Sequence, residues 1–120
     1  MRDHTKLRAF ELADELALRV YQRTRGFPPD EKFELTSQLR RGAVSIASNI
    51  VEGCARDSEN DYVRFLDMAH ASAKELQYQL SLARRLEYLS TTDAEPLESL
   101  ATETAKVLNG LIRALRKERL

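Results

Sequence analysis

Polar side chains with helical spacing mark two segments of the chain. In the first, Ser45, Asn49, Glu52 and Arg56 are spaced four, three and four residues apart, and in the second Ser72 and Glu75 are three apart. A helix would place each set on one face. A carboxylate in a partly buried seam needs a partner, which a nearby arginine can supply. We expect a polar network that fixes the register of two helices, and a ligand or nucleic-acid site is the alternative.

Arginines form three clusters that could contact phosphate groups. They are Arg40 and Arg41, Arg84 and Arg85, and Arg113 and Arg116. Phosphate binding requires several cations on one surface, whereas a solvated helix face carries similar clusters held in intrahelical ion pairs. The sequence leaves both interpretations open, and we treat these six arginines as candidate nucleic-acid contacts.

Few residues could support catalysis or hold a metal. Asp67 and His70 have the spacing of half a di-iron motif, but the chain has only two histidines, so we expect no metal and no cofactor. Arg64 and His70 resemble the Arg…His pair of helical-bundle ribonucleases of the HEPN class, which would use general acid–base chemistry. We expect a protein that is not an enzyme, with this ribonuclease as the alternative. Cys54 is the only cysteine, and a free cysteine usually behaves as a small buried hydrophobe.

Composition restricts the class of protein that carries these residues. The 120 residues suit one domain, 1–120, and 42% of them are hydrophobic, which is enough to build a core. Lys and Arg together number 19, and Asp and Glu together also number 19, so the net charge is zero. The overall charge therefore does not indicate a strongly basic nucleic-acid binder. Glycine and proline are too scarce for an all-β barrel. Without a visible secretory signal or apolar span, we expect a cytoplasmic protein that does not enter a membrane.

Apolar residues recur at steps of three and four in four segments. We predict helices over about 7–25, 29–56, 58–89 and 93–117. Pro29 suits a first helical position, Ser58 is a natural N-cap, and Pro96 falls in the first turn of the last helix. Thr92 with Glu95 predicts the cap of that helix, and Ser90 with Asp93 competes for this role. Short connections make neighbouring helices antiparallel, so the predicted fold is an all-α, up-down-up-down four-helix bundle.

Three stretches carry a resemblance to a known family. They are VYQRTRGFPPDE, FELTSQLRRGAVSIASNIVEGCAR at 33–56 and FLDMAHASAKEL at 65–76. Together they resemble the four-helix bundle proteins encoded in intervening sequences of bacterial large-subunit ribosomal RNA genes, also labelled S23-type ribosomal proteins. The family is similar in fold to accessory proteins of diversity-generating retroelements. Its polar signature falls on Gln38, Arg40, Arg41, Ser45, Asn49, Glu52, Gly53, Arg56, Ser72 and Glu75.

The resemblance implies a cytosolic homo-oligomer, often a ring of five subunits, with nucleic-acid binding inferred for the family and no settled activity. It adds Gln38 to the expected polar network. Apolar stripes on both the Tyr62 and Phe65 sides of the third helix predict that one closes the protomer and the other contacts a neighbour. We therefore expect a non-enzymatic homo-oligomeric scaffold, a pentamer by resemblance, whose partners are its own copies and RNA or DNA. A scaffold associated with the ribosome or with a reverse transcriptase is the other form that the resemblance allows. No small-molecule ligand is evident.

Overall fold

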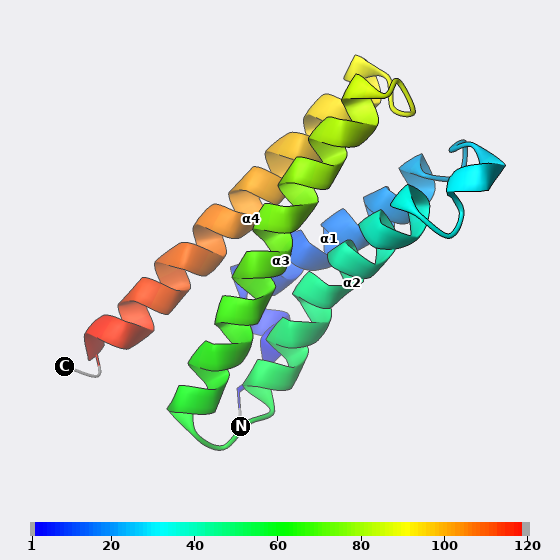
Figure 1. The fold of residues 1–120 in the computed structure, drawn as a ribbon. Coiled ribbons are helices and arrows are strands. Elements are labelled where there is room, and N and C mark those ends of the chain that lie inside the picture. Colours follow the sequence, from blue (N-terminus) through cyan, green and yellow to red (C-terminus); the bar gives the residue numbers. More distant parts are fainter. Residues whose placement is uncertain (1, 119–120) are drawn as a thin grey trace.

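The computed structural model describes residues 2–118 and shows four long helices that form a four-helix bundle (Figure 1). The elements are the short 3₁₀ helix η1 (His4–Lys6), α1 (Arg8–Arg23), the 3₁₀ helix η2 (Pro29–Glu31), α2 (Leu35–Cys54), α3 (Glu59–Arg85) and α4 (Thr91–Glu118). Each helix packs against the next, and α1 also packs against α4, which closes the bundle. The predicted all-α four-helix bundle is confirmed.

The bundle is 47 Å long and about 20 Å across, so it has two well-separated ends. The α1–α2 and α3–α4 connections lie at one end, here called the upper end, and the α2–α3 connection lies at the opposite, lower end (Figure 1). No helix within residues 2–118 is both long enough and apolar enough to cross a lipid bilayer.

Large aliphatic side chains from all four helices fill the core. Those without measurable exposure include Leu16 and Val20 of α1, Leu39, Ile46 and Ile50 of α2, Leu66, Leu76 and Leu80 of α3, and Leu108 of α4. Each such side chain contributes about 1.5–3 kcal/mol when it leaves water. The three- and four-residue spacing that predicted the helices is therefore the spacing of the buried face.

The helix starts follow side-chain caps more closely than apolar spacing. The predicted Ser58 cap of α3 is confirmed, because Ser58 Oγ accepts a hydrogen bond of 3.0 Å from the Asp61 amide. At the start of α4, Ser90 Oγ accepts from the Asp93 amide at 3.1 Å, so the competing Ser90 cap is correct and the Thr92 cap is wrong. The predicted start of the second helix at Pro29 is also wrong. Pro29 begins only the short η2, and α2 begins at Leu35.

Two backbone features shape the upper end of α3 and α4. Pro96 lies inside α4 and beyond its first turn, contrary to prediction, because the helix already begins at Thr91. Since proline has no amide hydrogen, α4 lacks one hydrogen bond at this point. Glu87, just after α3, has φ of 65°, the left-handed conformation that glycine usually adopts at a helix end. This residue turns the chain from α3 toward α4.

Candidate functional site

The predicted polar residues gather along the seam between α2 and α3. A shallow groove of about 250 Å³ runs along the upper part of this seam. Its lining residues are Gln38, Arg41, Gly42, Ser45, Ser72, Glu75 and Gln79. Four of them belong to the predicted network, and both helices contribute to it.

Hydrogen bonds link the middle of the seam. The hydroxyl oxygens of Ser45 and Ser72 lie 3.1 Å apart, which joins α2 to α3. Asn49 Nδ2 donates to the backbone oxygen of Ser45 at 2.8 Å and to its hydroxyl at 3.1 Å. The small hydroxyl side chains let the two helices approach closely here.

Gln79 is the network member that sequence analysis missed. Its Nε2 donates to Gln38 Oε1 at 3.5 Å and to Glu75 Oε1 at 3.4 Å, so it joins two predicted residues. The side chain is only 6% exposed, and its Oε1 has no hydrogen-bond partner among the described residues. Gly42 lies beside that oxygen. The signal was present in the sequence, because Gln79 follows Ser72 by two helical turns and shares its face.

Two predicted members, Glu52 and Arg56, do not join the network. Glu52 is exposed and makes no ion pair or side-chain hydrogen bond within residues 2–118. The Arg56 guanidinium lies over the Phe65 ring, 4.7 Å from its centre. Because the Glu52 carboxylate stays in water, it does not need the arginine partner that we expected for a carboxylate in the seam. The structural network is therefore shorter than predicted and shifted toward the upper end.

The six candidate arginines divide between the two ends of the bundle. Arg40 and Arg41 lie near the start of α2 and Arg84 and Arg85 at the end of α3, all at the upper end, whereas Arg113 and Arg116 lie near the end of α4, at the lower end (Figure 1). The bundle is 47 Å long, so the structure does not bring all six to one surface. Helix direction decides this, because α4 runs opposite to α3.

Several of these arginines already have partners. Arg84 Nε lies 3.1 Å from Glu98 Oε2, and Arg116 pairs with Asp67. Arg40 donates from Nε to Thr24 Oγ1 at 2.9 Å and lies over the Tyr21 ring. These contacts join α3 to α4 and α2 to α1, so they serve the packing of the bundle.

Arg64 and His70 lie on different flanks of α3. Arg64 forms an exposed ion pair with Asp61 and lies over the Phe65 ring, on the side that meets α2. His70 lines a cavity on the side that meets α4. The pair that the ribonuclease alternative needs is therefore not assembled within the protomer. No three His, Cys, Asp or Glu side chains in the described part of the chain are grouped as metal ligands.

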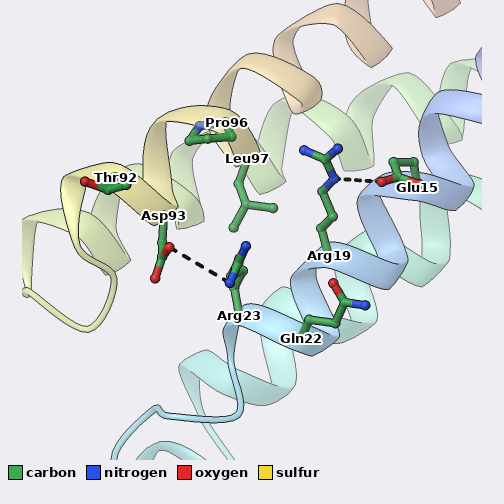
Figure 2. Close-up of a pocket in the computed structure, with 8 residues that line it drawn as sticks. All are labelled: Glu15, Arg19, Gln22, Arg23, Thr92, Asp93, Pro96 and Leu97. Atoms are coloured by element: carbon green, nitrogen blue, oxygen red, sulfur yellow. Dashed lines mark hydrogen bonds and ion pairs between the residues drawn. The ribbon is translucent and has the colours of Figure 1, made fainter.

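A groove of about 320 Å³ between α1 and α4 contains charged side chains that neutralise one another (Figure 2). Arg19 Nε lies 2.7 Å from Glu15 Oε1, and Arg23 Nη1 lies 4.0 Å from Asp93 Oδ1. Figure 2 shows Arg19 and Arg23 extending from α1, with Pro96 and Leu97 on the facing helix α4. Because each arginine has its own carboxylate, the groove carries no unpaired charge of either sign from these residues.

The cavity between α3 and α4 differs, because its cations have no carboxylate partner. It measures about 180 Å³ and is lined by His70, Lys74, Gln77, Thr102, Ala105, Lys106 and Asn109. Lys74 and Lys106 are exposed and form no ion pair within residues 2–118. Neither lysine was a candidate from the sequence. They lie far apart in the chain, and only the register of α3 against α4 brings them to one cavity.

Cys54 lies at the lower end of the core and is 1% exposed. Burial raises the pKa of the Cys54 thiol, which disfavours the reactive thiolate. Burial, with the neighbouring Cys54 as a further cause, raises the pKa of Tyr62 to about 12. Both groups therefore stay neutral near pH 7 and act as parts of the core.

Comparison with known proteins places these features in a family context. The family model of the 23S rRNA-intervening sequence protein matches residues 5–110. A crystal structure of a protein with unknown function from the S23 ribosomal protein family of Bacteroides thetaiotaomicron VPI-5482 superposes with a TM-score of 0.80 and 28% sequence identity. The match covers 87% of this chain and 97% of that one. None of the curated proteins searched matches this chain. Because the family model spans most of the sequence, the chain belongs to the 23S rRNA-intervening sequence protein family.

Proposed function

We propose that this protein is a non-enzymatic homo-oligomeric scaffold that binds nucleic acid. The observation that carries the oligomer is an apolar surface on α1 and α2 that the protomer leaves uncovered. The names of the matched family and of its structural relative, which refer to ribosomal RNA and to a ribosomal protein, support the nucleic-acid partner.

The uncovered surface, here called the α1–α2 patch, contains Leu18, Tyr21 and Val44, which are 55%, 44% and 40% exposed. Arg40 lies over the Tyr21 ring, which fixes the register of the two helices. Leu18 lies about one turn before Tyr21 on α1, and Val44 one turn after Arg40 on α2. Because the helices are antiparallel, Leu18 and Val44 lie on the same part of this face. Partly buried Ala17 and Ala47 provide further apolar area.

This surface differs from the one expected at Phe65. Phe65 is only 7% exposed in the single chain and packs against Gly53 of α2. The stripe on the Phe65 side of α3 therefore lies largely within the protomer and does not supply the proposed interface there. Contiguous exposed apolar surface marks protein interaction sites, so the α1–α2 patch takes that role in the proposal.

Molar mass in solution tests the oligomer. The parent protein should elute as a multimer in size-exclusion chromatography with light scattering, and five chain masses would match the ring that the family resemblance implies. The double variant Leu18→Glu/Val44→Glu should be monomeric, because carboxylates in an apolar interface cost several kcal/mol. Met68→Glu, which changes an exposed apolar residue of α3, is the matched control and should stay multimeric. A monomeric parent protein at micromolar concentration would refute the proposal.

Nucleic-acid binding needs a separate assay. The probes are fluorescein-labelled 20-nucleotide RNA and DNA of one sequence, titrated with protein and read by fluorescence anisotropy at several salt concentrations. Binding that weakens steeply with salt is expected, because phosphate contacts release counterions. If neither probe binds at 50 mM salt, the nucleic-acid part of the proposal is wrong, and the oligomer assay still stands.

A further inference from the structure

The face formed by α3 and α4 holds the unpaired cations of the bundle's central region. Gln77 Nε2 donates to Thr102 Oγ1 at 2.7 Å, which fixes the register of the two helices. Lys74 lies about one turn before Gln77 on α3, and Lys106 one turn after Thr102 on α4. Since the helices are antiparallel, the two lysines lie across the groove from each other, and both line the same cavity.

Nearby carboxylates on this face do not neutralise the lysines. Asp67 pairs with Arg116, below the cavity, and Glu98 pairs with Arg84, above it. Glu103, which lines a neighbouring groove with Lys106, pairs with Arg8 of α1. Arg113 extends the cationic surface, because it follows Asn109, a lining residue, by one turn and forms no ion pair within the described chain. His70 also lines the cavity and can add a donor.

Neither lysine forms an ion pair or a side-chain hydrogen bond within residues 2–118 that would hold the helices together. Like charges on facing helices repel. An anion between them would replace this repulsion with attraction. Two lysines with an arginine nearby suit a chain of phosphates better than a single carboxylate, since each cation can meet its own phosphate.

Gln77 fixes the two helices that carry the lysines. Its Nε2 is bound to Thr102, whose hydroxyl donates to the Glu98 backbone oxygen at 2.9 Å, so the orientation of the amide is fixed. Gln77 Oε1 is shielded from solvent, so a ligand on this face does not reach it.

We infer that the α3–α4 face binds the phosphate backbone of a single-stranded nucleic acid. In this inference Lys74, Lys106 and Arg113 contact phosphates. The inference rests on the proposed nucleic-acid binding and assigns it a surface, and the RNA and DNA probes below distinguish the two sources of that backbone. Of the six arginines predicted from the sequence it keeps only Arg113, and the two lysines become the principal contacts.

The test measures anisotropy of the labelled 20-nucleotide RNA and its DNA equivalent with the parent protein and two charge variants. Lys74→Gln/Lys106→Gln should weaken RNA binding at least tenfold at 100 mM salt. Its slope of log affinity against log salt should flatten by about 1.4, the value for two lost contacts to a single strand. Arg41→Gln/Arg85→Gln removes the same charge at the upper end and should bind within twofold of the parent. Circular dichroism and thermal melting confirm that both variants fold.

Other outcomes overturn the site itself. If the lysine variant binds RNA as the parent does, or if the Arg41/Arg85 variant is the one that loses binding, the α3–α4 assignment is wrong and the proposed function survives. If polyglutamate displaces the RNA as well as unlabelled RNA does at equal charge, the face selects acidic polymers in general and the inference is wrong. If the parent protein binds neither probe, both the inference and the proposed nucleic-acid binding are wrong.

Discussion

The lower and upper halves of the α2–α3 seam each contain a glycine on α2, but the two glycines have different surroundings. A Cβ atom on Gly53, in the lower half, would lie 3.0 Å from Phe65 Cβ and 3.3 Å from the Tyr62 backbone oxygen. A Cβ atom on Gly42, in the upper half, would lie 3.5 Å from Gln79 Oε1 and 3.8 Å from Leu76 Cδ1. The lower half has no room for a methyl group, whereas the upper half has ordinary van der Waals space for one.

This difference separates close packing from polar pairing in one helix interface. In the lower half, the side chains of Tyr62 and Phe65 pack against the backbone at Gly53, so the stability of this half depends on how closely these groups fit. The upper half is held by long polar side chains whose hydrogen bonds, at 3.4 and 3.5 Å, are weak. A change of the same kind should therefore have opposite effects in the two halves.

The largest effect should come from Phe65→Ala. The ring is 7% exposed and covers the lower half of the seam, so its loss leaves a cavity beside Gly53. We expect the free energy of unfolding to fall by about 3–4 kcal/mol in urea denaturation. A loss below about 1 kcal/mol would show that the lower half does not depend on this ring.

Gly53→Ala should have the next largest effect. The contact of 3.0 Å is with Phe65 Cβ, which moves only with the backbone of α3, so the two helices must separate. Overpacking costs about 1–3 kcal/mol, against a gain in helix propensity of about 1 kcal/mol. We expect a net loss of up to about 2 kcal/mol in the same urea assay. A stabilised variant would contradict the close packing described.

Raising the pH should destabilise the lower half through Tyr62. The pKa of Tyr62 is about 12 in the folded protein, above its ordinary value of 10.0. Folding therefore favours the neutral phenol, and this stability is complete below pH 10 and lost as pH rises through 12. Between pH 8 and pH 11 the parent protein should lose about 1 kcal/mol more than Tyr62→Phe does. Equal losses in both proteins would mean that Tyr62 ionises normally.

The smallest effect, and one of opposite sign, should come from Gly42→Ala. Alanine in a helix interior is favoured over glycine by up to about 1 kcal/mol, and the new methyl group meets no close contact. We expect the free energy of unfolding to rise by about 0.5–1 kcal/mol. A loss of stability would mean that the upper half is packed as tightly as the lower half, and the comparison would fail.

Sequence alone predicted the helices well because their buried face repeats every three or four residues over long segments. It misplaced the start of α2 because Pro29 and the acidic residues after it suit a helix start in general. The chain uses them for one short 3₁₀ turn and starts again at Leu35. Where the helix begins depends on how the preceding loop packs, and the spacing of apolar residues carries no information about that packing.

The candidate site was harder to predict for a related reason. Residues on one helix, such as Ser45 and Asn49, share a face by spacing alone, and their hydrogen bond follows from it. Residues on different helices meet according to register, which depends on packing along the whole interface. The sequence therefore missed Gln79 and the pair formed by Lys74 and Lys106. It also grouped arginines that helix direction sends to opposite ends.

The left-handed conformation of Glu87, between α3 and α4, bears on whether two molecules can exchange a helix by domain swapping. Glu87 reverses the chain in a conformation that costs a β-branched residue about 1–2 kcal/mol. Glu87→Val would disfavour this conformation, so the connection that folds α4 back onto α3 should open more readily. A molecule whose α4 has opened away can accept α4 from a second molecule, which makes this connection a route to domain-swapped dimers.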